Sequence, residues 1–325
     1  MDKRDVVLAL LDEEKALPYV PAAFFMHFGA AYRMGQTAID RHLAYFRHTD
    51  MDFVKVQYEH EFPRIPEILR PTDWGKMPVY DAGFFAAPLE VVKGLVDAAK
   101  GEALVLMTLY SPFMCAGHAT SDALVTAHLQ EDPEAVKVGM EAITESLLNF
   151  VGACVDVGVD GFYASTQGGE AGRFVSDGSR IFEAYIKPYD LAVWEEIDAA
   201  CQFSILHVCD YHRGYDDLTP FLDYPGQVVN ASLDVGGETL TPRQMVACFG
   251  RPFMGGMERT GVVASGDQAQ IGASVDEVLA SAPDRFILGA DCTVPGTTSW
   301  DDIRVAVDTA HAHTHAHAPQ RPSER

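Results

Sequence analysis

Short runs of β-branched and aromatic residues alternate with longer amphipathic stretches along almost the whole chain. Eight such runs have the length and the residue types of strands. They lie at 22–28, 53–58, 104–109, 161–165, 203–208, 228–233, 252–257 and 286–289. Apolar positions at helical spacing fill several intervals between them, at 89–99, 133–155, 181–200 and 300–310. The pattern therefore predicts repeated strand-then-helix units.

Units of this kind imply a parallel sheet, and eight of them imply an α/β fold closed as a (β/α)₈ TIM barrel. We expect one catalytic barrel domain over residues 1–310, with an N-terminal helical extension before the first run. An open doubly wound sheet is the alternative, and it is disfavoured because no Gly-x-Gly-x-x-Gly turn follows an early strand. Residues 311–325 begin with alternating histidines and end in proline and charge, which predicts a disordered tail.

Composition limits the class of protein. At 35.5 kDa and 48% hydrophobic residues, the chain can bury a large core. Its six cysteines follow no framework spacing, which fits reduced thiols better than disulfides. No uninterrupted apolar stretch approaches the roughly 20 residues that cross a bilayer, and the charged start does not resemble a signal peptide. We therefore expect a cytoplasmic protein that does not enter the membrane.

The formal net charge of −23 argues against nucleic-acid binding, because no Lys/Arg patch is present to neutralise phosphates. A strongly solvated acidic surface is the simplest interpretation of this charge. It also disfavours strongly anionic partners unless the binding pocket is locally basic. Small molecules are therefore the expected partners.

Residues that follow barrel strands line one mouth of the barrel, where active sites of this fold gather. Polar and titratable residues come directly after most of the eight runs. These candidates are His27, Glu59, His60, Tyr163, Asp210, Asp234, Glu258 and Asp291, with Tyr32, Glu61, Tyr110, Ser111, Gln167 and Glu170 beside them. We expect them to surround one pocket.

The strongest chemical signal is a His-x-Cys pair, His207 and Cys209, at the end of the fifth run, with Cys292 just after the eighth. Residues two apart on a strand point to the same side, so His207 and Cys209 can reach one ion. Three protein ligands leave a fourth tetrahedral position open, as in catalytic zinc sites. A purely structural role of these residues in the core stays open as an alternative, because buried cysteines and hydrogen-bonded core histidines are common. The position at strand ends favours zinc.

Other candidates have less specific roles. Glu258 or Asp234 is a candidate fourth ligand, since carboxylate oxygen suits zinc, although each is more often a loop residue. Asp210 and Asp291, next to ligands, are candidates to orient His207, and an ordinary helix cap is the alternative. The expected substrate-binding or proton-transferring residues are His27, Glu59, His60 and Tyr163. Taken singly, each of these is more often structural.

Two segments carry a resemblance to a known family. The stretch Met26-His27-Phe28-Gly29-Ala30-Ala31-Tyr32, the stretch 288–295 (LGADCTVP) and the spacing of the runs between them resemble the uroporphyrinogen decarboxylase superfamily. The resemblance covers almost the whole chain. Within that superfamily, the His-x-Cys pair and the later cysteine resemble the zinc motif of methylcobamide:coenzyme M methyltransferases, and cobalamin-independent methionine synthase has a similar His-x-Cys.

The resemblance implies that His207, Cys209 and Cys292 bind one zinc ion and that the open position receives a substrate thiol. The decarboxylases have arginines, which hold the substrate carboxylates, in the stretch that matches 26–32. This chain has His27 and Ala31 there, with Arg33 close by as partial compensation. Tetrapyrrole decarboxylation is therefore the less favoured activity.

We accordingly predict a zinc-dependent methyltransferase that activates a thiol for methyl transfer from a methylated corrinoid protein or a related donor. The chain lacks an Asp-x-His-x-x-Gly corrinoid signature, so a corrinoid would arrive on a partner protein. A metal-free decarboxylase and a zinc hydrolase on the same barrel remain alternatives. So do a non-catalytic protein that handles metal or corrinoid and, least favoured, an interaction module. The resemblance also implies a homodimer.

Overall fold

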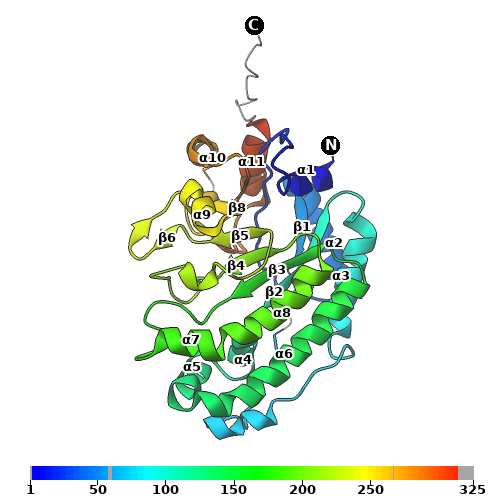
Figure 1. Ribbon diagram of the computed structural model, residues 1–325. Coiled ribbons are helices and arrows are strands. Elements are labelled where there is room, and N and C mark those ends of the chain that lie inside the picture. Colours follow the sequence, from blue (N-terminus) through cyan, green and yellow to red (C-terminus); the bar gives the residue numbers. More distant parts are fainter. Residues whose placement is uncertain (1, 58–60, 266, 314–325) are drawn as a thin grey trace.

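A computed structural model describes residues 2–57, 61–265 and 267–313, and its main feature is one curled, fully parallel sheet (Figure 1). Its strands are β1 (Phe53–Val56), β2 (Leu104–Tyr110), β3 (Gly161–Thr166), β4 (Ile205–Val208), β5 (Val228–Ala231), β8 (Phe253–Met257) and β9 (Phe286–Ala290). They are hydrogen-bonded in chain order. A separate antiparallel hairpin consists of β6 (Asp234–Val235) and β7 (Glu238–Thr239).

β4 and β5 are joined by a loop with one 3₁₀ turn, Thr219–Phe221, whereas the other connections of the parallel sheet, and the chain before β1 and after β9, contain α-helices. The α-helices are α1 (Lys3–Ala9), α2 (Gly35–Thr49), α3 (Ala86–Ala99), α4 (Pro112–Ala119), α5 (Asp122–Glu131), α6 (Pro133–Asp156), α7 (Gly178–Tyr185), α8 (Lys187–Ala200), α9 (Pro242–Phe249), α10 (Gln268–Ser281) and α11 (Trp300–Ala312). Short 3₁₀ turns are η1 (Ala30–Tyr32), η2 (Pro71–Lys76), η3 (Thr219–Phe221) and η4 (Val262–Ala264). The helix α1 is the predicted N-terminal extension.

Local sequence explains where two important elements begin. Ser111 caps α4 by accepting a hydrogen bond from the backbone of Met114, and Pro112 takes the first helical position, where its missing N–H costs nothing. In β4 the alternation puts Ile205 and His207 on one side and Leu206 and Val208 on the other. Ser111, which the sequence predicted at the pocket, is therefore a helix cap.

The first predicted run, 22–28, contains no strand of the seven-stranded sheet. Ala22 forms a single parallel bridge with Leu288 of β9, and the Ala23 N–H donates to the Leu288 carbonyl at 3.0 Å. On the β1 side the backbone of Asp52 donates to the Ala22 carbonyl at 3.0 Å. Seven of the eight predicted runs are thus strands, and the observed fold is a curled parallel sheet consistent with a TIM-like barrel.

Asp52 explains why no ladder forms between this segment and β1. Its carboxylate, fully buried, accepts the Ala22 N–H at 2.7 Å, so that donor is taken by a side chain and not by a neighbouring strand. The same carboxylate accepts from the Tyr19 hydroxyl at 2.7 Å and lies 2.8 Å from Nε2 of His311. One side chain therefore joins the N-terminal segment, β1 and α11.

The contact with His311 bears on the predicted tail. His311 belongs to α11, which ends at Ala312, so the domain boundary predicted at residue 310 falls inside this helix. Residues 314–325 lie outside the described residues, and the disorder predicted for them stays a prediction. A truncation that preserves the fold should keep His311.

Within the part of the chain that the structure describes, one helix, α6, is long and apolar enough to cross a membrane by length and composition alone. It contacts α8, α4 and η2 within the fold, and Figure 1 shows α6 and α8 side by side. Its buried residues include Met140, Ile143, Leu147 and Phe150. Packing inside the protein therefore accounts for its hydropathy.

The Asp52 contacts lead to a stability prediction. Asp52→Asn should lower the free energy of unfolding by about 3 kcal/mol, because a buried carboxylate that accepts several hydrogen bonds is replaced by a neutral amide. Asp97→Asn is the matched control, since Asp97 forms only an exposed ion pair with Lys93 and should change stability by less than about 0.5 kcal/mol. Urea unfolding measures both variants. Equal effects of the two changes would contradict a special role for Asp52.

Candidate metal centre

The predicted trio meets in the structure. The ligand atoms of His207, Cys209 and Cys292 all lie within 4.8 Å of one another, and the three residues are buried. His207 lies on β4, Cys209 follows it, and Cys292 comes two residues after β9. In the sheet, β5 and β8 separate β4 from β9, so the curl of the sheet is what brings these ends together.

The His207 ring is held by packing. It stacks on the ring of Tyr163, with 5.0 Å between centroids and 30° between planes. Its Nδ1 atom is buried and has no hydrogen-bond partner among the described residues. A buried ring nitrogen is normally paired, and one that has no protein partner can offer its lone pair to a metal ion, as a ligand nitrogen must. The donor set of one imidazole and two thiols therefore fits a metal ion such as zinc.

Both cysteines are anchored through their backbones. The Cys209 N–H donates to the Thr166 carbonyl at 3.0 Å, and the Gln167 amide donates to the Cys209 sulfur at 3.4 Å. The Cys292 N–H donates to the carboxylate of Asp291, next to it in sequence, at 3.0 Å. The two cysteines thus belong to different loops, and each is held by a hydrogen bond from its own backbone.

The two thiols perturb each other. The Cys209 thiol donates to the Cys292 sulfur, and this bond, together with the neighbouring His207, holds the pKa of Cys292 well below its ordinary range. The same bond and burial raise the pKa of Cys209 well above its ordinary range. Cys209 therefore keeps its proton to a higher pH than Cys292 does. A metal ion that takes both sulfurs as thiolates must displace that proton.

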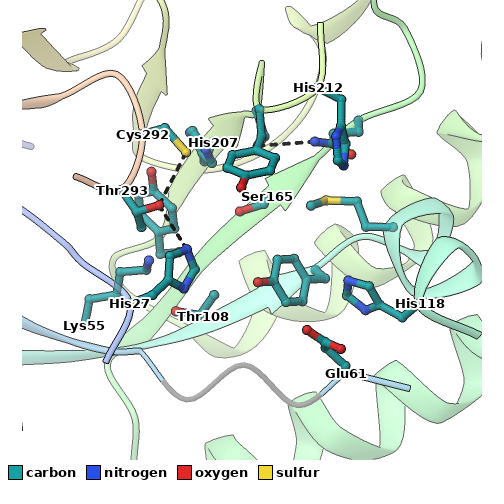
Figure 2. Close-up of a pocket in the computed structure, with 16 residues that line it drawn as sticks. His27, Lys55, Glu61, Thr108, His118, Ser165, His207, His212, Cys292 and Thr293 are labelled. Carbon is teal, nitrogen blue, oxygen red and sulfur yellow. Dashed lines mark hydrogen bonds between the residues drawn. The ribbon is translucent and has the colours of Figure 1, made fainter. Parts of the chain in front are cut away.

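The trio opens into a cavity of about 240 Å³. Figure 2 shows Cys292 and Thr293 on one side of this cavity and His118 and Glu61 on the opposite side. Among the described residues the lining consists of His27, Lys55, Glu61, Thr108, Tyr110, Met114, His118, Tyr163, Ser165, Gln167, His207, Cys209, Tyr211, His212, Cys292 and Thr293. A small molecule bound here would contact His207, Cys209 and Cys292 directly at one end.

His27 lines the cavity at the end that carries Cys292 (Figure 2). Its Nε2 atom lies 3.0 Å from the Thr293 hydroxyl, and that hydroxyl lies 3.9 Å from the Cys292 sulfur. The His27 side chain is exposed, so it can exchange protons with water. The arrangement links solvent to the sulfur ligands through two side chains.

Tyr163 lines the cavity, but its hydroxyl is committed elsewhere. It donates to the side chain of Asn230, whose amide in turn donates to the carbonyls of Met254 at 2.9 Å and Ala290 at 3.0 Å. Burial raises the pKa of Tyr163 well above its ordinary range. Its phenol therefore stays protonated, and its geometry suits it to hold the His207 ring and not to transfer protons.

The two predicted carboxylates next to ligands do not bond to His207. Asp210 and Asp291 both accept hydrogen bonds from Arg259, at 2.8 Å and 3.0 Å. The two predicted fourth ligands are not brought to the trio. Glu258 is exposed, and Asp234 accepts from Thr239 at 2.6 Å within the β6–β7 hairpin. Glu59 and His60 lie outside the described residues.

The most important residues that sequence reasoning missed are cations. Lys55 is buried on β1, with its ammonium 4.3 Å from the centre of the Tyr163 ring and 3.2 Å from the side-chain oxygen of Gln57. It was overlooked because it lies inside an apolar run. A lysine that alternates with valines on a strand nevertheless indicates a side chain that points to the opposite side of the strand from the valines. Arg259 directly follows Glu258, and no local pattern distinguishes it.

A buried carboxylate lies behind the site. Asp190 on α8 accepts from the hydroxyls of Thr166, at 2.5 Å, and Tyr224, at 3.0 Å. Burial raises the pKa of Asp190 to about 7, although the two hydrogen bonds oppose the rise. Between about pH 4 and pH 7 the folded protein therefore keeps a proton that the unfolded chain has lost. The contribution of this group to stability falls as the pH rises through that window.

This shift yields a prediction on pH dependence. Asp190→Asn should gain stability relative to the parent as the pH rises from 4 to 7, by up to about 3 kcal/mol, and the difference should level off above pH 7. Asp198→Asn, an exposed position on the same helix, should show no such trend. Urea unfolding at several pH values measures the difference. A flat difference for Asp190→Asn would contradict the raised pKa.

Comparisons with known proteins agree with this fold. The uroporphyrinogen decarboxylase (URO-D) family matches residues 50–313. A methyltransferase from Methanosarcina mazei is similar in structure, with a TM-score of 0.72 at 14% identity over 95% of this chain and 98% of that one. No curated protein shows a significant match.

Two further solved structures share the fold. A putative vitamin-B12-independent methionine synthase from Listeria monocytogenes has a TM-score of 0.59 at 14% identity, over 90% of this chain and 96% of that one. A B12-independent methionine synthase from Shewanella sp. W3-18-1, in complex with selenomethionine, has a TM-score of 0.56 at 10% identity, over 90% and 97%. At these identities the likeness is one of fold.

Proposed function

The chain belongs to the uroporphyrinogen decarboxylase family, and from that premise we propose that it is a zinc-dependent methyltransferase that methylates a thiol. The observation that carries the proposal is the meeting of His207, Cys209 and Cys292 within 4.8 Å at the end of a cavity. An imidazole and two thiolates suit zinc, and three protein ligands leave a position for a substrate. The methyltransferase and methionine synthase folds among its structural neighbours agree with this activity.

Zinc bound by these residues would hold a substrate thiol as its thiolate at neutral pH, and a thiolate is the nucleophile that methyl transfer needs. The thiol must lose its proton before the methyl group is transferred. His27, with its bond to Thr293 beside Cys292, is the residue placed to accept that proton. Tyr163 and Gln167 keep His207 and Cys209 in place.

The volume of the cavity limits the size of the molecules that can bind inside it. About 240 Å³ holds a small thiol, and a corrinoid macrocycle is far too large for it. A methylated corrinoid would therefore present its methyl group at the mouth, carried by a partner protein. A smaller methyl donor would enter the cavity itself.

Decarboxylation of a tetrapyrrole receives less support. The described lining of the cavity contains one lysine, Lys55, and no arginine. Arg33, which could replace the arginines of the decarboxylases, is exposed and does not line the cavity. A substrate with several carboxylates would find one lysine and no arginine among the described lining residues. A zinc hydrolase would use the same ligands with water in place of the thiol, and the reaction assay separates the two.

Metal content tests the proposal first. Protein truncated after His313, which keeps the contact of His311 with Asp52, should contain about one zinc per chain by elemental analysis. Cys292→Ser should lose most of it, because two protein ligands bind zinc far less tightly than three. Cys248→Ser, which removes an exposed cysteine outside the site, is the matched control and should keep the zinc. A parent protein without zinc would overturn the proposal.

The reaction itself is the second test. With methylcobalamin as donor and a panel of small thiols as acceptors, mass spectrometry should detect an S-methyl product. His27→Ala should lower the rate on the order of 100-fold while leaving zinc content unchanged, as expected for loss of a proton acceptor. Ester or amide hydrolysis without any thiol would indicate a zinc hydrolase instead. Decarboxylation by the zinc-free protein would point to the decarboxylase activity of the family.

A further inference from the structure

A single guanidinium lies between the two loops that carry the metal cysteines. Each of these cysteines is next in sequence to an aspartate, as Cys209–Asp210 and Asp291–Cys292. Nη1 of Arg259 donates to Asp210 at 2.8 Å and to Asp291 at 3.0 Å. One nitrogen atom therefore ties the loop after β4 to the loop after β9.

The backbone of Arg259 adds a third connection. Its N–H donates to the second oxygen of Asp291 at 2.7 Å, and that same oxygen accepts the N–H of Cys292 at 3.0 Å. The loops after β4, β8 and β9 thus converge on one ion-paired group. Its three side chains are between 15% and 21% exposed, so water weakens these bonds less than it would at the surface.

The sheet alone does not hold the two sulfurs at a fixed separation. β4 and β9 are not hydrogen-bonded to each other, since β5 and β8 lie between them. Small changes of curl across three strand pairs would change the distance between Cys209 and Cys292. Without Arg259, moreover, two carboxylates that now share one nitrogen would repel each other.

We propose that Arg259 is a positioning residue that holds Cys209 and Cys292 at the separation needed to bind one metal ion. The proposal rests on the metal site of the proposed function, although its geometric part applies to the protein alone. Arg259 does not line the cavity among the described residues, so it acts through the two aspartates and not on the substrate. The three ligand residues come from the ends of two strands, β4 and β9. Arg259 connects them to the end of a third strand, β8.

Zinc affinity is the first measurement, by competition with a chromophoric chelator. Arg259→Met should weaken zinc binding roughly 10- to 100-fold, the usual effect of removing a residue that orients metal ligands. Arg259→Lys should recover part of the loss, because one nitrogen makes both side-chain contacts. Arg304→Met is the matched control, since Arg304 also pairs with two aspartates, Asp308 and Asp50, but contacts neither ligand loop. It should keep the parental affinity.

A second measurement needs no metal. In zinc-stripped protein, diamide takes two electrons and two protons from a pair of thiols, which become a disulfide while diamide becomes the corresponding hydrazine. Mass spectrometry of the peptides gives the rate at which the Cys209–Cys292 cross-link forms. Arg259→Met should slow this rate at least several-fold because the sulfurs are no longer held near each other. Arg304→Met should cross-link at the parental rate.

The two measurements separate this inference from the proposed function. Parental behaviour of Arg259→Met in the cross-linking assay, or in the zinc assay where the parent binds zinc, overturns the positioning role. If the parent binds no zinc but Arg259→Met cross-links slowly, the proposed function is wrong and the positioning role stands. Thermal unfolding of all variants detects a general loss of stability. Slower cross-linking at an unchanged melting temperature is a local effect of Arg259, whereas a general loss of stability also lowers the melting temperature.

Discussion

The site depends on the curl of a parallel sheet. Its strands run in chain order from β1 to β9, and each is hydrogen-bonded to the next. Because all of them point the same way, every loop that follows a strand emerges at one end of the sheet. The curl of the sheet brings these loops close to one another. Residues from β4 and β9, far apart in the sheet order, can then bind one ion. A flat sheet with the same sequence would not form this site.

Electrostatics around the site differ from those of the protein as a whole. The chain has a net charge of −23, yet its cavity holds a buried lysine and several histidines. Two thiols and two aspartates sit beside them, and Arg259 lies between the aspartates. A divalent cation bound by two thiolates would therefore meet an environment already balanced in charge.

Within its family the chain combines a decarboxylase-type fold with a donor set that decarboxylation does not require. The cavity contains a His/Cys/Cys trio and lacks arginine among its described lining residues. Fold alone does not decide between activities, because one barrel supports many reactions through its loops. The side chains at the strand ends carry the argument for thiol methylation.

Periodicity along the chain was sufficient to predict the parallel sheet, and the His-x-Cys pair with the later cysteine was sufficient to select the trio that the structure brings together. The alternation of a strand places His207 and Cys209 on one side, and this follows from local geometry alone. Other features depended on contacts between distant segments. The first run became a bridging segment because Asp52, 30 residues away, takes the Ala22 N–H. Arg259, and not its neighbour Glu258, reached the ligand loops. Both outcomes depend on how the sheet curls and on which loops meet. The spacing of residues along one strand carries information on neither.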